Sequence, residues 1–152
     1  MPKKVSHEPT RSFPIALGHC LLVALLTSSG CENQPPADLG PDARVAVDDA
    51  NYETIVAQST KPVVMEFHAD WCGPCRASEP AVVALSNEMP EIVFAKIDVD
   101  RALEVTAKYS VNSIPCFIFF KDGKVVGREV GGINKDDLRA MIANYLAASP
   151  TP

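Results

Sequence analysis

Two cysteines, Cys72 and Cys75, lie where a strand-like segment passes directly into a helical one. Residues 62–68 are rich in β-branched and aromatic side chains and predict a buried strand. Residues 72–89 follow with helical periodicity, and Pro80 inside them should kink the helix. A strand that feeds directly into a helix restricts the chain to folds that mix the two elements.

Strand and helix patterns continue to alternate along the chain. Further strands are predicted at residues 44–47, 91–99, 115–120 and 124–130, and further helices after 48–49, at 101–108 and after 134. Asp48 or Asp49 can cap the first of these helices and Asn134 the last. Asp122-Gly123 is a strong hairpin signal. The order β-α-β-α-β-α-β-β-α predicts an α/β fold: a mixed sheet with helices on both faces.

Residues 1–30 are predicted to be a secretory signal peptide. They begin with basic residues, continue with an apolar run at 13–26 and end with small residues before Cys31. The run is shorter than the roughly 20 residues that span a bilayer. Ser28-Ser29-Gly30-Cys31 resembles the bacterial lipoprotein box, although that box usually has Leu where Ser28 stands. Plain secretion and an uncleaved anchor are the alternatives.

The segment that follows the predicted cleavage site is rich in proline and poor in apolar residues. Residues 31–43 therefore predict a flexible tether, and 44–148 a single folded domain. Lipid on Cys31 would hold this domain beside a membrane. The net charge of −5 and the lack of a basic stripe argue against nucleic acid as a partner.

The two cysteines suit dithiol–disulfide exchange. Cys72 at a helix N-terminus would be stabilised as the thiolate nucleophile, and Cys75 one turn later could resolve the mixed disulfide. Gly73 and Pro74 fit the start of a helix. Half of a zinc site is an alternative, but only His68, Cys116 and Cys31 remain after export to complete it, so no metal is expected. A permanent structural disulfide is the other alternative.

These segments resemble thioredoxin over about residues 45–146. The resemblance rests on PVVMEFHADWCGPCRASEP, AKIDVD, the SIP tripeptide, the KDGK hairpin and VGGINKDDL. It implies a five-stranded sheet in the order 1-3-2-4-5 and a cis peptide bond between Ile114 and Pro115. It also implies a substrate-binding surface, formed by Trp71, Gly73, Pro74, Ile114, Pro115, Gly131 and Gly132.

Three positions depart from the usual thioredoxin pattern. Glu66 stands where the family has a buried Asp, and it could transfer the proton exchanged with Cys75; an ion pair with Lys96 is the alternative. His68 replaces a common Trp and could make the redox poise depend on pH near neutrality, or it could simply be a satisfied side chain. Cys116, where Thr is common, could be a small buried residue or a third thiol that forms a regulatory disulfide.

The resemblance predicts a monomeric protein-disulfide reductase that needs no cofactor beyond its own redox-active disulfide. Its substrates would be proteins with disulfides outside the cytoplasm. Exported compartments are oxidising, so a membrane thiol reductase is the expected electron donor. A thiol oxidant or disulfide isomerase is one alternative. A non-catalytic module that carries a metal such as copper is another.

Overall fold

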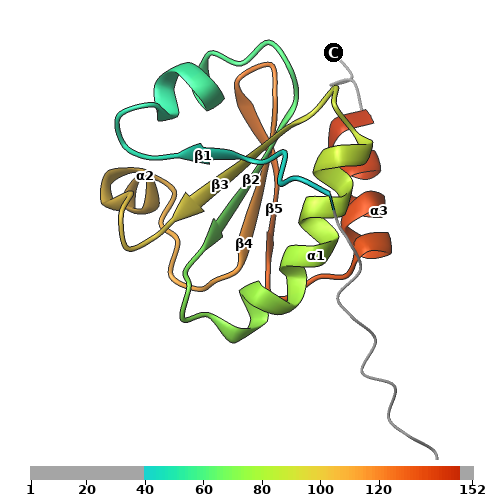
Figure 1. Ribbon diagram of the computed structural model, residues 1–152. Coiled ribbons are helices and arrows are strands. Elements are labelled where there is room, and N and C mark those ends of the chain that lie inside the picture. Colours follow the sequence, from blue (N-terminus) through green and yellow to red (C-terminus); the bar gives the residue numbers. More distant parts are fainter. Residues whose placement is uncertain (1–39, 148–152) are drawn as a thin grey trace, which may run out of the picture. The chain divides into compact units, whose positions relative to one another are not determined.

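The computed structural model describes residues 40–147, which form a five-stranded sheet with helices packed on it (Figure 1). The elements in chain order are β1 (Val45–Val47), the π-helix η1 (Glu53–Ala57), β2 (Val63–His68), α1 (Gly73–Glu88), β3 (Val93–Asp98), α2 (Leu103–Lys108), β4 (Cys116–Lys121), β5 (Lys124–Val130) and α3 (Lys135–Ala147). The predicted signal peptide, Cys31 and most of the predicted tether lie outside the described residues.

The strands are arranged in the order β1-β3-β2-β4-β5, which confirms the predicted mixed sheet. β1 and β2 both run parallel to β3, and β4 runs antiparallel to β2 and β5. Glu66 in β2 is in register with Lys96 of β3 on one side and with Phe117 of β4 on the other. The centre of the sheet therefore holds a carboxyl group flanked by a cation and an aromatic ring.

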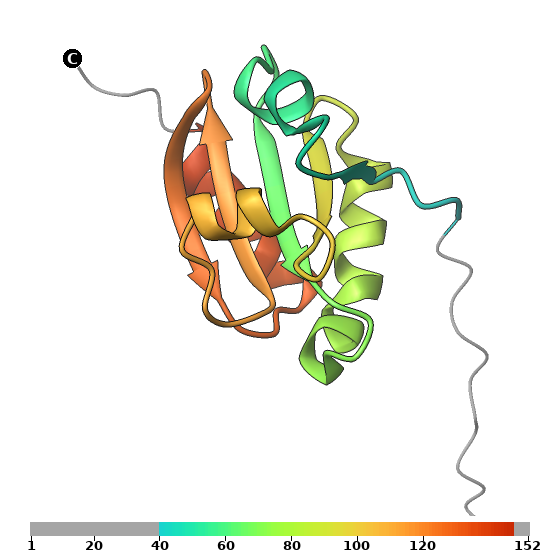
Figure 2. The same ribbon diagram turned by 90° about the vertical axis from the view of Figure 1, so that its left-hand side faces the viewer.

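Each face of the sheet is covered by its own pair of helices. α1 and α3 lie on one face, and η1 and α2 lie on the other (Figures 1 and 2). Side chains alternate along β2, so Val64 packs with Leu85 of α1 and Leu138 of α3, whereas Met65 packs with Val56 and Val105 on the opposite face. The expected helices on both faces are confirmed.

The aspartates before the first helix have separate roles. Asp48 accepts hydrogen bonds from the N–H groups of Ala50 and Asn51, both at 3.0 Å, and so closes the turn that leads to η1. Asp49 instead reaches α2, where its carboxylate accepts the N–H groups of Glu104 (3.2 Å) and Val105 (2.9 Å). Asp49 therefore caps a helix that lies more than 50 positions further along the chain.

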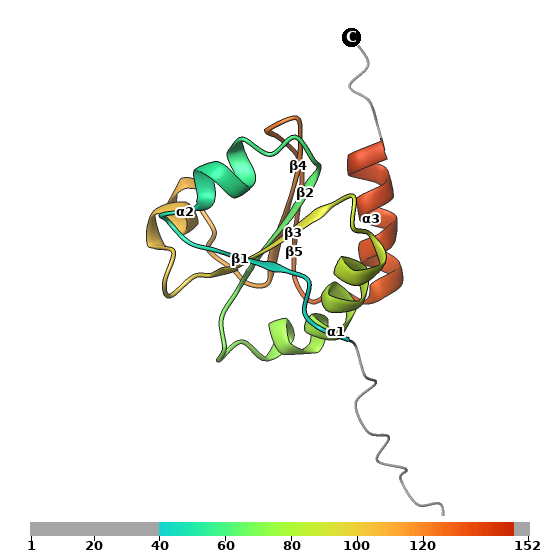
Figure 3. The ribbon, with the colours of Figure 1, turned by 45° about the horizontal axis from the view of Figure 1, so that its top comes forward.

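The remaining turn signals act locally, as predicted. Asp122 and Gly123 both have positive φ, +51° and +71°, as a two-residue hairpin turn between β4 and β5 requires. The Asn134 side chain accepts the N–H of Asp137 at 2.9 Å and caps α3. Pro80 lies inside α1, and the helix changes direction along its length in Figures 1 and 3.

Candidate active site

Cys72 and Cys75 form a disulfide at the first turn of α1. Cys72 is the N-cap residue, and the N–H of Cys75 donates a hydrogen bond to Cys72 Sγ at 3.2 Å. Pro74 adds no N–H group at a position where the helix could not pair one. Each cysteine is only 4% exposed. The sulfur of Cys72 therefore faces the unpaired N–H groups of a helix start, which favour a thiolate.

Apolar residues surround the disulfide, and one of them begins a cis peptide bond. Ala69, Val99 and Ile114 pack against the two cysteines. The Ile114–Pro115 peptide bond is cis, as expected, and the carbonyl of Pro115 accepts the N–H of Gly131 at 2.9 Å. Gly131 has a φ of +116° that favours glycine. The two loops predicted to receive substrate are thus joined by a backbone hydrogen bond.

Trp71 stands beside the disulfide with most of its ring in solvent. Its side chain is 67% exposed, yet its indole N–H donates to Asp100 Oδ2 at 2.8 Å. An exposed indole that is held in one orientation offers a partner protein a large apolar surface at little entropic cost.

Ser78 is a buried residue that the sequence prediction missed. Its hydroxyl donates to the carbonyl of Pro74 (3.2 Å) and accepts the N–H of Ile133 (2.8 Å). A Cβ on Gly132 would lie 3.6 Å from the same hydroxyl. Ser78 therefore fixes the start of α1 to the loop that contains Gly131 and Gly132.

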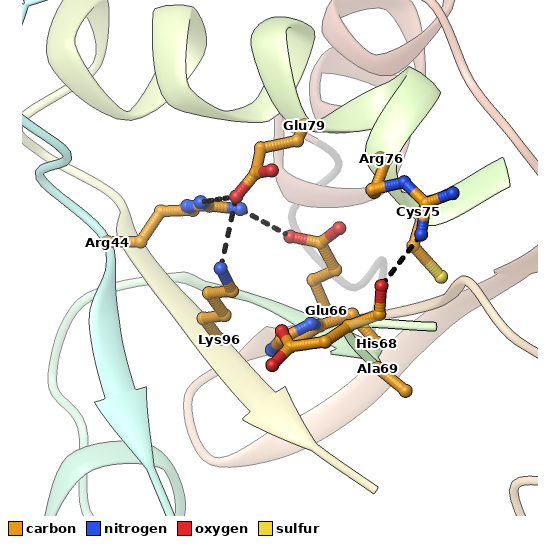
Figure 4. Close-up of a pocket in the computed structure, with 9 residues that line it drawn as sticks. Arg44, Glu66, His68, Ala69, Cys75, Arg76, Glu79 and Lys96 are labelled. Atoms are coloured by element: carbon orange, nitrogen blue, oxygen red, sulfur yellow. Dashed lines mark hydrogen bonds and ion pairs between the residues drawn. The ribbon is translucent and has the colours of Figure 1, made fainter. Parts of the chain in front are cut away.

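A cavity of about 110 Å³ lies under the disulfide, on the face of the sheet covered by α1. Figure 4 shows Cys75 and Arg76 on one side of it and Arg44, Glu79 and Lys96 on the other. A space of this size can hold water next to polar groups. Its lining residues are Arg44, Glu66, His68, Ala69, Asp70, Cys75, Arg76, Glu79 and Lys96.

Glu66 is paired with Arg44 and not with Lys96, which corrects the alternative drawn from the sequence. Arg44 Nη1 donates to Glu66 Oε2 at 3.1 Å, and Arg44 Nη2 donates to Glu79 Oε1 at 2.7 Å. Lys96 Nζ donates to the same Glu79 oxygen at 3.1 Å. Lys96 is in register with Glu66, but the exposed carboxylate of Glu79 attracts it away from the sheet.

The surroundings move the pKa values of the two carboxyl groups in opposite directions. Burial raises the pKa of Glu66, and the nearby Arg44 opposes that rise. Hydrogen bonds from Arg44 and then Lys96 hold the pKa of Glu79 below its usual range. Of the two, Glu66 is thus the carboxyl group better suited to taking up a proton, and Glu79 stays ionised.

His68 is half-buried and lines the same cavity as Cys75 and Glu66. Burial, reinforced by the positive charge of Lys96, lowers its pKa, so the imidazole is neutral at pH 7. The influence of His68 on the redox poise stays a prediction; a His68→Trp variant whose reduction potential tracks the wild type from mildly acid to mildly alkaline pH would contradict it.

Cys116 is a free cysteine, fully buried in the core on the η1 and α2 side of the sheet. Burial raises the pKa of its thiol. A buried, protonated thiol reacts slowly, which favours its interpretation as a small core residue.

Arg44 and Glu79 were missed as site residues for different reasons. Glu79 follows Cys75 by four positions on α1, and this helical spacing puts both on one face, so the signal was present. Arg44 bonds Glu66 and Glu79 across 22 and 35 positions. No local sequence pattern predicts a contact between residues so far apart in the chain.

Neither a metal centre nor a bilayer-crossing helix is found in residues 40–147. No group of three or more His, Cys, Asp or Glu side chains within this range could hold a metal ion. No helix in the same range combines the length and the apolar character that crossing a membrane requires.

Comparison with known proteins gives a consistent result. The thioredoxin family model matches residues 43–144. An H-type thioredoxin of Picea mariana is 47% identical over 89 residues, 59% of this chain and 70% of the relative. A thioredoxin of Chlamydia trachomatis is 43% identical over 83 residues, 55% of this chain and 81% of the relative. The X-ray structure of Fasciola hepatica thioredoxin matches with a TM-score of 0.61 and 45% identity, covering 67% of this chain and 98% of that one.

The fold, the disulfide at the start of α1, the cis proline and these matches agree with one another. The chain therefore belongs to the thioredoxin family and is a protein-disulfide reductase that acts on proteins containing disulfides, with the Cys72–Cys75 pair as its redox group.

Proposed function

We propose that this member of the thioredoxin family reduces the disulfides of proteins outside the cytoplasm, held at a bacterial membrane by lipid on Cys31. The observation that supports a reductase most strongly is the Cys72–Cys75 disulfide at the start of α1, next to the cis Ile114–Pro115 bond. The signal-peptide pattern of residues 1–30 and the box ending at Cys31 support the location.

The reaction begins with the reduced protein and a substrate disulfide. The Cys72 thiolate attacks one substrate sulfur, the substrate S–S bond breaks, and the other substrate sulfur leaves as a thiolate that takes a proton from water. Cys72 and the substrate are then joined by a mixed disulfide. Trp71, Gly73, Pro74, Ile114, Pro115 and Gly131 form the surface on which the substrate chain lies.

Glu66 acts in the second step. Its carboxylate accepts the proton of the Cys75 thiol, directly or through water in the cavity, and the Cys75 thiolate attacks Cys72 Sγ. The mixed disulfide breaks, the second substrate sulfur leaves as a thiolate, and the Cys72–Cys75 disulfide forms. Two electrons have passed from the dithiol to the substrate disulfide, so the protein must then be reduced again.

A membrane thiol reductase is the proposed electron donor, because an exported compartment is kept oxidising and offers no general pool of reductant. Two membrane proteins, the donor and the lipid-anchored acceptor, would then meet by diffusion in two dimensions. The proline-rich residues before the domain would give the redox site the reach to contact the donor.

A trapping experiment tests the reaction and its location together. Cys75→Ser leaves Cys72 able to attack but removes the resolving thiol, so substrates remain attached as mixed disulfides. Expressed as the full chain in bacteria, this variant should accumulate on exported proteins in the membrane fraction, whereas Cys72→Ser should trap nothing. Adducts found only with cytoplasmic proteins would contradict the proposed location.

The reduction potential of the Cys72–Cys75 pair tests the direction. A value near the roughly −270 mV typical of thioredoxin is expected for a reductant. A value near the roughly −120 mV of strongly oxidising relatives would mean that the protein donates disulfides instead. Replacing Cys31 with Ser in the full chain should release the protein from the membrane fraction without changing this potential.

A further inference from the structure

Arg44 contacts the redox site from outside the segments that carry the active-site motif. It precedes β1, and β3 lies between β1 and β2 in the sheet, so its side chain crosses β3 to reach Glu66 (Figure 4). The Arg44 side chain is 2% exposed. A buried guanidinium that crosses a strand to meet a buried carboxylate is costly to desolvate, and its hydrogen bonds must compensate for that cost.

Those hydrogen bonds fix the guanidinium on three carboxylates. Asp42 binds it in a bidentate manner, with Nε donating to Oδ1 (2.8 Å) and Nη2 to Oδ2 (2.7 Å). The remaining donors point at Glu66 and Glu79. Because Asp42 holds the planar fork in place, Arg44 can impose an orientation on Glu66 as well as supply a charge.

The orientation of the Glu66 carboxylate is the part that matters for catalysis. Arg44 bonds Oε2, and Figure 4 shows the other oxygen on the side away from Arg44, toward Cys75. Glu66 and Cys75 line the same cavity, so this second oxygen is the candidate acceptor of the Cys75 proton. Without Arg44 the carboxylate could rotate toward Lys96, its in-register neighbour on β3.

We propose that Arg44 is a positioning residue for the exchange reaction: it orients the Glu66 carboxylate toward Cys75 and connects it, through Glu79, with solvent. Glu79 is 42% exposed and shares the guanidinium with Glu66. A proton taken from Cys75 can then leave Glu66 through water in the cavity and reach bulk water beside Glu79, which stays ionised.

The pH at which Glu66 titrates depends on every charged group around it. Arg44 before β1 and Lys96 on β3 favour the ionised carboxylate, and Glu79 on α1 disfavours it. The other titratable or charged groups that line the cavity are His68 on β2, Asp70 in the following loop, and Cys75 and Arg76 on α1. The register partner of Glu66 on β4 is Phe117, which carries no charge.

The proposal rests on the role proposed above for Glu66 as proton acceptor, and the experiment separates the two. It measures turnover with insulin as the disulfide substrate and dithiothreitol as reductant across the pH range, and it follows the Glu66 carboxyl by ¹³C NMR in the reduced protein. The variants are Arg44→Met, Arg44→Lys, Glu66→Gln and the double variant Arg44→Met/Glu66→Gln. Arg139→Met, which removes an arginine from the exposed ion pair with Glu88, is the matched control.

We expect Arg44→Met to move the Glu66 titration and the acid limb of the rate profile upward together. The rate at pH 7 should fall about threefold or more, a small part of the roughly 10²–10⁴-fold that general acid–base catalysis contributes. Arg44→Lys should recover part of both shifts, because it restores the charge but not the fork. In the Glu66→Gln background, Arg44→Met should leave the shape of the pH profile unchanged, and Arg139→Met should behave as wild type.

Two results would overturn the inference, and they differ from each other. If Glu66→Gln changes the pH profile but Arg44→Met and Arg44→Lys leave the Glu66 titration where it was, Arg44 has no positioning role although Glu66 accepts the proton. If Glu66→Gln keeps the wild-type profile, the role of Glu66 fails and this inference fails with it. If Arg44→Met does not fold, Arg44→Lys and its combination with Glu66→Gln decide the matter.

Discussion

Glu66 is a buried carboxyl group on which two opposite influences act. Its removal from water favours the protonated form, and Arg44 favours the ionised form. The net rise in its pKa means that desolvation is the larger of the two. Ionisation of Glu66 therefore lowers the free energy of unfolding.

Glu66→Gln should therefore be at least as stable as the wild type at pH 7, since burial no longer penalises a charge there and Arg44 keeps Asp42 and Glu79 as partners. A group whose folded pKa is raised contributes stability below its ordinary pKa and loses it as the pH rises through the folded value. The advantage of the variant should accordingly shrink to nothing as the pH falls to 4.5, the ordinary value. Urea unfolding of both proteins at several pH values measures this difference in the free energy of unfolding.

Glu79→Gln provides the comparison, because the pKa of Glu79 is lowered. It should lose stability at pH 7, in the direction opposite to Glu66→Gln. A Glu66→Gln variant that is less stable than wild type at pH 7 would mean that the attraction to Arg44 exceeds the cost of burial.

Among the elements, those with a local signal were predicted from the sequence, and contacts between distant elements were not. The Asp122-Gly123 turn and the Asn134 cap act within a few residues, so composition and spacing reveal them. The sheet order came from the resemblance to thioredoxin. The contacts of Asp49 with α2 and of Arg44 with Glu66 depend on how β1 packs in three dimensions, which no window of sequence contains.

Asp49→Ala tests the cap that Asp49 provides for α2. The N–H groups of Glu104 and Val105 lose their acceptor, so the free energy of unfolding should fall by about 1 kcal/mol, as for other N-caps. Hydrogen exchange should accelerate at these two amides more than at the end of α2. Glu91→Ala, a change at an exposed loop residue, is the control; equal exchange rates in wild type and Asp49→Ala would contradict the assignment.

At Gly127 the backbone of β5 lies close against the ring of Tyr145 of α3. A Cβ there would lie 2.4–2.6 Å from ring atoms of Tyr145, whose hydroxyl donates to Glu129 at 2.6 Å. Gly127→Ala must displace the ring and should cost about 1–3 kcal/mol, the usual range for overpacking. At Gly73 a Cβ would meet nothing within 4 Å, so Gly73→Ala should leave thermal stability almost unchanged. Equal melting temperatures for both variants would contradict this account.

At the scale of the whole molecule, the two faces of the sheet differ in character. The face under η1 and α2 buries an apolar and aromatic core. The face under α1 and α3 buries apolar side chains together with the Arg44–Glu66 pair. α1 contributes two carboxylates to the ion pairs of this face: Glu79 near the redox site, and Glu88, which binds Lys135 and Arg139 of α3.

These ion pairs predict how the molecule responds to acid. Hydrogen bonds from Arg44 lower the pKa of Asp42 and Glu79, and those from Lys135 and Arg139 lower the pKa of Glu88. A lowered pKa gives stability that is present above the ordinary value and is lost as the pH falls through the folded value. The free energy of unfolding should therefore decline as the pH drops below the ordinary glutamate value of 4.5.

High salt distinguishes the contribution of the Glu88 ion pairs from that of the Arg44 ion pairs. The exposed Glu88 pairs are screened at 1 M NaCl, whereas those of the buried Arg44 are screened much less. The part of the acid decline that survives high salt should disappear in Arg44→Met. Persistence of the full decline in that variant at 1 M NaCl would show that other carboxyl groups cause it.

Arg44 stands immediately before β1, so the residue at which a recombinant domain begins decides whether Glu66 keeps its guanidinium partner. A recombinant domain that began at Val45 would retain every strand and helix of the fold. It would nevertheless lack the Arg44 guanidinium and the Asp42 carboxylate that binds it. Lys96, in register on β3, would then be the cation beside Glu66 on the sheet. Such a shortened protein would fold and exchange disulfides, but its Glu66 would take up and release protons in a different pH range. Rates measured on two preparations are therefore comparable only when both begin upstream of Asp42.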